Sequence, residues 1–249
     1  MWLAVRHRHE LRKGKRIEPL DYFRIKSVHS FAELVATPFA DGVNALCWPR
    51  LLHGDFGEVV EKLGPGHGIE TIEDEKLREL EVSAAGREAI AVLREDLRRL
   101  REQERDPVLN CVHDYPREEE PGPVRTDVFS FHVDSAPVEA DTWLCTYHGR
   151  PSEGLRNEEA IPRVDIPETR AELLKFLGAE ADDADFREAL REHCYDLHYA
   201  PLPEARPYSF GVGNLWRIAV AWPGSAVPPC IHRAPEKLPG DPARLLLIC

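Results

Sequence analysis

The spacing of hydrophobic residues changes character near residue 107. The segment 86–107, "GREAIAVLREDLRRLREQERDP", carries an apolar stripe at the three- and four-residue spacing of one helix face, made up of Ile90, Leu93, Leu97 and Leu100. A shorter segment, 56–63, repeats that spacing and stops at Gly64. Pro107 ends the long helix. We therefore expect residues 1–106 to be mainly helical and to pack on a core that the rest of the chain forms.

Beyond Pro107 the pattern shifts to the two-residue period of strands. "VRTDVFSFHVD" alternates clearly, and further strand-like segments lie at 141–149, 215–222, 228–232 and 244–249. A helical insertion at about 166–196 interrupts them. Short strands around a helical insertion predict an α+β protein whose core, at residues 107–249, is a barrel or jelly roll. We expect the two parts to form one integrated domain.

Charge narrows the class of ligand. The chain has 249 residues and a formal net charge of −12, whereas a nucleic-acid surface relies on clustered lysine and arginine. The basic segment 1–16 is the exception, and it is typical of either a polybasic arm or a solvated terminus. A small-molecule or peptide partner suits the chain better than nucleic acid, and the oligomeric state stays open.

Hydropathy and cysteine usage bear on location. No apolar run approaches the ~20 residues of a membrane span, and the N-terminus has no apolar signal region. The six cysteines are scattered, without a C-x-x-C pair. We expect a reduced, cytoplasmic protein that does not insert into a membrane.

Two His-x-Asp pairs are the first candidates for chemistry. His53 and Asp55 precede the helix at 56–63, where an aspartate caps free backbone amides, so this pair needs no metal. His132 and Asp134 instead lie at the end of a predicted strand. Alternate strand residues share one face, so both side chains can point into one cavity. Their spacing suits two ligands of one metal ion.

A third ligand is available downstream. His232 ends one predicted strand, and Arg244 begins the next. Two imidazoles and one carboxylate on one side of a metal are typical of non-haem Fe(II) oxygenases. An arginine on the following strand suits the distal carboxylate of a 2-oxo acid, because its guanidinium can bind a carboxylate with two hydrogen bonds.

This arrangement resembles the Fe(II)/2-oxoglutarate-dependent dioxygenase superfamily. "FHVDSAPVEADTWLCTYHGRPSEGL" and "CIHRAP" are also similar to an uncharacterised bacterial family of that kind, and the likeness covers about residues 125–249. The resemblance implies a double-stranded β-helix with Fe(II) at His132, Asp134 and His232. It also implies 2-oxoglutarate at Arg244, consumption of O₂, and release of succinate and CO₂. The insertion accounts for the long gap before His232.

The resemblance also bears on the outcome and on a further cosubstrate contact. A carboxylate at Asp134, where related halogenases have glycine or alanine, favours hydroxylation or another oxidation over halogenation. Tyr147 is a candidate for a hydrogen bond to the cosubstrate, and the alternative is a core tyrosine with a wet hydroxyl.

Two further residues, and two rival functions, stay open. His148 is either a substrate contact or a solvent-facing residue beside a turn, and Arg233 reaches either substrate or a surface carboxylate. One rival function is a jelly-roll protein that binds a metal or another ligand and catalyses nothing. The other is a cupin-type metal enzyme that does not use 2-oxoglutarate.

Overall fold

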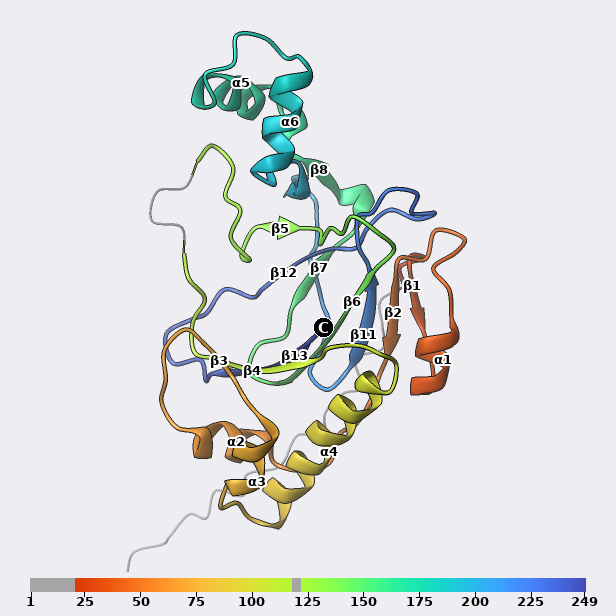
Figure 1. Cartoon of the computed structure of the whole chain (residues 1–249), viewed down its shortest axis with the longest axis vertical. Coiled ribbons are helices and arrows are strands. Elements are labelled where there is room, and N and C mark those ends of the chain that lie inside the picture. The colour runs from red at the N-terminus through yellow and green to blue at the C-terminus, as the bar shows by residue number, and fades with distance from the viewer. Residues whose placement is uncertain (1–20, 118–121) are drawn as a thin grey trace, which may run out of the picture.

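The computed structural model describes residues 21–117 and 122–249, in which two mainly antiparallel sheets are flanked by helices (Figure 1). The mixed α+β class predicted from the sequence is confirmed. The basic segment 1–16 lies outside the described residues. None of the helices in the described ranges is both long and apolar enough to cross a membrane.

The larger sheet has seven strands in the order β1-β2-β11-β6-β13-β4-β3. Its neighbours pair antiparallel, apart from the parallel pair β1–β2. The strands of this sheet are β1 (Ile25–Ser27), β2 (Ala45–Trp48), β3 (Ile69–Thr71), β4 (Val108–Val112), β6 (Asp141–His148), β11 (Leu215–Ala219) and β13 (Arg244–Ile248).

The smaller sheet has six short strands in the order β10-β7-β12-β5-β9-β8, all paired antiparallel. These strands are β5 (Phe131–His132), β7 (Glu153–Leu155), β8 (Ala160–Pro162), β9 (His198–Pro201), β10 (Tyr208–Ser209) and β12 (Ile231–Arg233).

Six α-helices lie in the described residues, in two groups (Figure 1). The N-terminal group is α1 (Phe31–Ala36), α2 (Phe56–Leu63), α3 (Asp74–Glu79) and α4 (Ala84–Arg101). The second group, α5 (Pro167–Phe176) and α6 (Ala184–Glu192), falls within the predicted insertion. Three short 3₁₀ turns accompany them: η1 (Asn157–Glu159), η2 (Arg163–Asp165) and η3 (Tyr195–Leu197).

The two faces of the larger sheet bury different cores, because successive strand residues point to opposite sides. The helix-facing core packs the stripe of α4, including Leu93 and Leu97, against Trp143 and Tyr147 of β6. The inner core lies between the sheets and contains Leu144 of β6, Leu246 of β13, Trp216 and Phe210. Each fully buried side chain of this size contributes about 1.5–3 kcal/mol.

Two features of the secondary structure were not predicted. The first part of the chain contains α1 to α4, but it also supplies the short strands β1, β2 and β3 to the larger sheet. β2, "ALCW", is a short apolar run that is almost wholly buried on both faces and shows no alternation. Periodicity does not separate such a run from a helix fragment.

The predicted strand at 124–134 is much shorter than its alternation indicates. Only Phe131 and His132 join the ladder. Upstream, the Asp127 carboxylate accepts a hydrogen bond from the Phe129 amide at 3.1 Å, and the Asp127 carbonyl accepts one from the Ser130 amide at 3.1 Å. These local bonds close a turn in place of strand pairing. The turn delivers His132 directly onto the sheet.

Candidate metal centre

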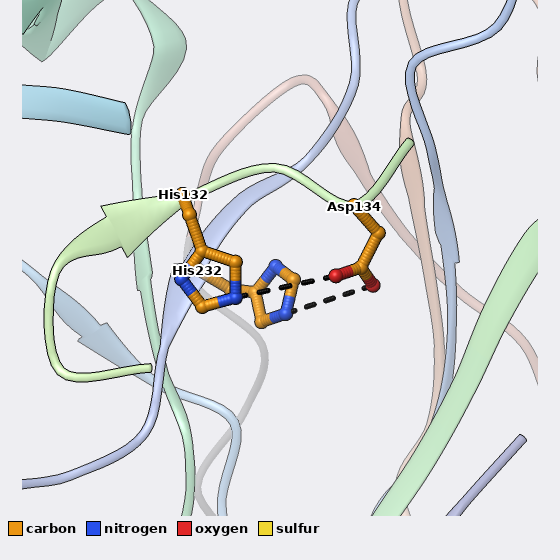
Figure 2. A group of neighbouring side chains, drawn as sticks. All are labelled: His132, Asp134 and His232. Carbon is orange, nitrogen blue, oxygen red and sulfur yellow. Dashed lines mark ion pairs between the residues drawn. The ribbon is translucent and has the colours of Figure 1, made fainter. Parts of the chain in front are cut away.

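His132, Asp134 and His232 converge on one point (Figure 2). His132 of β5 and His232 of β12 are directly opposite each other in an antiparallel pair, and their ring centroids are 4.6 Å apart. Asp134 follows β5 and turns its carboxylate toward both rings (Figure 2). One ligand atom from each residue lies within 4.8 Å of the other two. The structure therefore brings together the three predicted ligands.

The distances are slightly longer than those around a bound metal. The Nε2 atom of His132 lies 4.0 Å from Asp134 Oδ1, and the Nε2 atom of His232 lies 3.8 Å from Asp134 Oδ2. Bonds of about 2.1 Å at right angles place neighbouring ligand atoms about 3 Å apart. A shift of about 1 Å in the side chains would close that gap, which lies within ordinary rotamer adjustment.

Neighbouring groups fix the orientation of each ligand. The Nδ1 atoms of His132 and His232 lie 2.8 Å and 3.3 Å from the carbonyl oxygens of Ser130 and Cys230. A carbonyl only accepts, so Nδ1 carries the proton and the lone pair of Nε2 faces Asp134. The Thr142 hydroxyl donates to Asp134 Oδ2 at 2.5 Å. Such outer contacts are typical of metal ligands.

The electrostatics favour a metal over a simple ion pair. Burial, together with the neighbouring His232, lowers the pKa of His132 to about 4. The imidazole is therefore uncharged at neutral pH, and a neutral ring gains little from a carboxylate 4.0 Å away. Two neutral imidazoles and one carboxylate form a donor set that a divalent transition metal satisfies.

Arg244, at the start of β13, is a buried cation without a buried anion. Its side chain donates to Tyr115 Oη at 2.8 Å, to Thr146 Oγ1 at 2.9 Å and to Ser152 Oγ at 2.6 Å. Its Nε atom is buried without a hydrogen-bond partner. Across the described ranges no carboxylate forms an ion pair with it.

Arg244 is nonetheless charged. The residue is 6 % exposed, and burial lowers the pKa of the guanidinium. An arginine keeps its proton even so, because the pKa of a guanidinium starts far above neutral pH. A buried charge with only neutral partners is costly unless an anion joins it. Arg244 therefore has the properties of a ligand contact.

The sheet register relates Arg244 to the metal-ligand cluster. Ser152, which contacts the guanidinium, lies two residues before Gly154, and Gly154 is directly opposite His232. Two residues of extended chain span about 7 Å, the backbone length between the Ser152 position and the position opposite His232. Gly154 is also required here, because a Cβ at this position would lie 2.2 Å from the Tyr208 ring.

A cavity of about 430 Å³ opens beside Arg244. Tyr115 and Phe129 line it together with the loop at 235–242, and the three candidate ligands do not. Three other basic residues at its rim are already engaged: Arg117 pairs with Glu236, Arg150 pairs with Asp241, and Lys237 donates to the His113 carbonyl. Of the cavity's arginines in the described residues, Arg244 is the one without a carboxylate partner.

Tyr147 lies away from Arg244. Its hydroxyl donates to Asp96 Oδ2 at 2.7 Å, and its ring stacks on Phe56 in the helix-facing core. Thr146, the preceding residue, points to the opposite face and contacts Arg244. The structure thus gives Tyr147 the surroundings of a core tyrosine, although its hydroxyl is hydrogen-bonded rather than wet. Thr146 takes the place next to the guanidinium.

The remaining predicted residues are also placed outside the cluster. His148 is half-buried at the first turn of α2, near Gly57 and Asp55. Arg233 pairs with Glu153 at 2.7 Å and lies over the Phe131 ring at 4.2 Å. The cap predicted at Asp55 is confirmed, since its Oδ1 accepts from the Glu58 amide at 2.9 Å.

Sequence reasoning missed four hydroxyl-bearing residues that contact the cluster or the arginine: Thr142, Thr146, Ser152 and Tyr115. Strand parity alone places Thr142 and Thr146 on one face of β6. A threonine on a strand face is too common to be singled out by that signal.

Comparison of the chain with protein-family models, with curated proteins and with solved structures finds no match. The site's geometry therefore carries the functional inference.

Proposed function

We propose that the protein is a non-haem Fe(II)- and 2-oxoglutarate-dependent oxygenase. It would hydroxylate a small-molecule or peptide substrate and release succinate and CO₂. The observation that carries this proposal is the combination of a two-histidine, one-carboxylate cluster with a buried arginine that lacks an anionic partner. Either feature alone fits several functions, whereas the two together suit a metal enzyme with an acidic cosubstrate.

The strand order supports a double-stranded β-helix. Eight strands from β4 onward, leaving out β8 and β9 on either side of the insertion, pair in a nested manner. The first pairs with the last (β4–β13), the second with the seventh (β5–β12), the third with the sixth (β6–β11) and the fourth with the fifth (β7–β10). That nesting, split over two facing sheets, is the pattern of a jelly roll.

In this proposal His132, Asp134 and His232 hold Fe(II), and their grouping on one side leaves the opposite positions for cosubstrate and O₂. Bound Fe(II) supplies O₂ activation coupled to decarboxylation of 2-oxoglutarate, with one oxygen atom entering succinate and the other the substrate's hydroxyl group. Thr142 and the Ser130 and Cys230 carbonyls keep the three ligands oriented.

Arg244 would bind the distal carboxylate of 2-oxoglutarate. Its planar guanidinium can give that carboxylate two hydrogen bonds, and burial strengthens each of them. Thr146 and Ser152 lie 2.9 Å and 2.6 Å from the guanidinium, so their hydroxyls can reorient and donate to the same carboxylate. The bound dicarboxylate would thus supply the negative charge that the surroundings of Arg244 lack.

The rival functions fit the arginine less well. A metal enzyme without 2-oxoglutarate needs the three ligands but gives Arg244 no partner. A non-catalytic binding protein has the same difficulty unless its own ligand is an acid.

The test is an anaerobic titration with Fe(II) followed by 2-oxoglutarate, monitored by visible absorption. We expect a weak metal-to-ligand charge-transfer band that needs both additions. His232→Ala should remove it and weaken metal retention at least about 100-fold, because even outer-sphere losses cost 10–100-fold. His67→Ala is the matched control, since His67 is exposed and outside the cluster. Absence of the band, with no iron retained after desalting, would overturn the proposal.

A further inference from the structure

Three histidines lie in one row across the smaller sheet, and only two of them belong to the metal-ligand cluster. His232 pairs with His132, and His132 pairs in turn with His198 of β9. The rings of His132 and His198 are 5.7 Å apart. Directly paired residues of antiparallel strands share a face. His198 therefore lies beside the candidate metal centre on the same side of the sheet.

An arginine lies next to the end of this row. β8 pairs with β9 so that Pro162 is opposite Tyr199. Arg163 is the next residue along the chain and begins η2, which leaves the ladder there and contacts β9, the strand of His198. Burial, His132 and the positive charge of Arg163 together lower the pKa of His198.

Both of these side chains carry an unused polar atom. His198 Nδ1 and Arg163 Nε are buried without a hydrogen-bond partner. In the described residues Arg163 forms no ion pair, and burial together with nearby Arg125 lowers the pKa of its guanidinium. Asp127, the acid near His198, is engaged by Arg125 and by the Phe129 amide. Positive charge at Arg163 is thus left without a counterion in a chain of net charge −12.

We propose that Arg163 and His198 form a subsite for an anionic group, a carboxylate or a phosphate, on the substrate. β8, which ends just before Arg163, lies two strand spacings from β5, so the anion would sit about 10 Å from His132. The substrate would accordingly be a small acid whose anionic group binds at one end of the row while its reacting carbon lies at the other. That this small acid is the substrate rests on the proposed oxygenase function, whereas the binding of an anion by Arg163 and His198 does not.

The probe is inorganic phosphate, and ³¹P NMR measures its binding to the full chain without metal. Arg244→Met serves as the background, because Arg244 could bind phosphate by itself. Added Arg163→Gln should weaken phosphate binding roughly tenfold or more, the usual effect of losing charge-assisted hydrogen bonds. Arg163→Lys keeps the charge and should lose only part of the affinity. Arg187→Gln, in α6 of the insertion and paired with Asp182 at the surface, should not change phosphate binding.

A second stage separates this subsite from the proposed function. Mn(II) binding is measured by electron paramagnetic resonance, and the broadening of bound phosphate is then recorded. Broadening that depends on both Arg163 and His232 supports both proposals. Arg163-dependent phosphate binding without Mn(II) at the cluster would uphold the subsite and overturn the metal centre. Mn(II) binding with equal phosphate affinity in Arg163→Gln and Arg187→Gln would overturn the subsite alone.

Discussion

The two faces of the larger sheet each bury an arginine, and the two arginines are satisfied in opposite ways. On the helix-facing side, Arg50 lies 2.7 Å from Asp96, and these side chains are 8 % and 2 % exposed. Arg50 also donates to the Gly213 carbonyl at 3.0 Å. On the inner side, Arg244 is equally buried but meets only hydroxyl groups.

The difference separates a charge that is neutralised within the protein from one that is not. The Arg50–Asp96 pair is closed, because Tyr147 donates to the same carboxylate and the charges cancel within the protein. Arg244 has hydroxyl groups as hydrogen-bond partners but no anion, so its charge is available to a ligand. A buried cation surrounded by neutral groups points to an acidic ligand more strongly than an exposed one does, because water cannot stabilise it.

The largest effect is expected from Asp96→Ala, which opens the closed pair. Removing the carboxylate leaves the Arg50 charge buried and unpaired, a loss of about 3–5 kcal/mol in the free energy of unfolding. Urea denaturation followed by circular dichroism measures it. Glu102→Ala, whose carboxylate pairs with Arg98 at the surface, is the control and should change stability by less than about 1 kcal/mol. Equal effects of the two variants would contradict the distinction.

Arg244→Met, in contrast, should weaken cosubstrate binding without lowering stability. Replacing an uncompensated buried charge by an apolar side chain of similar length should leave stability unchanged or raise it. The affinity for 2-oxoglutarate, measured by calorimetry on the metal-loaded protein, should fall by about 10–100-fold, because charge-assisted hydrogen bonds are lost. A large loss of stability with unchanged cosubstrate affinity would make Arg244 a second structural arginine.

The smallest effects come from removing one hydroxyl on each face. Tyr147→Phe should lower stability by about 1 kcal/mol, through the lost bond to Asp96, and leave 2-oxoglutarate affinity unchanged. Tyr115→Phe should do the opposite, because Tyr115 contacts Arg244 at the cavity. The affinity for 2-oxoglutarate should fall a few-fold, and the free energy of unfolding should change little. If Tyr147→Phe lowered the affinity for 2-oxoglutarate instead, Tyr147 would have a role in cosubstrate binding despite its place in the helix-facing core.

Local patterns predicted several features whose physical cause is local. The stripe of α4 follows from helix geometry, and Asp55 caps α2 through an amide three residues away. Strand alternation likewise predicts that His132 and Asp134 share a face, and the structure turns both toward one point. Alternation failed for 124–130, where hydrogen bonds to Asp127 compete with strand pairing.

Only the tertiary structure decided which distant residues meet and which charges remain unpaired. His232 faces His132 because β12 pairs with β5, and Arg163 comes near His198 because it follows β8, which pairs with β9. The sequence contains 44 acidic residues, any of which could have neutralised Arg244. That none of those described does so depends on the packing of both sheets, because a missing partner is a property of the whole surroundings and not of a motif.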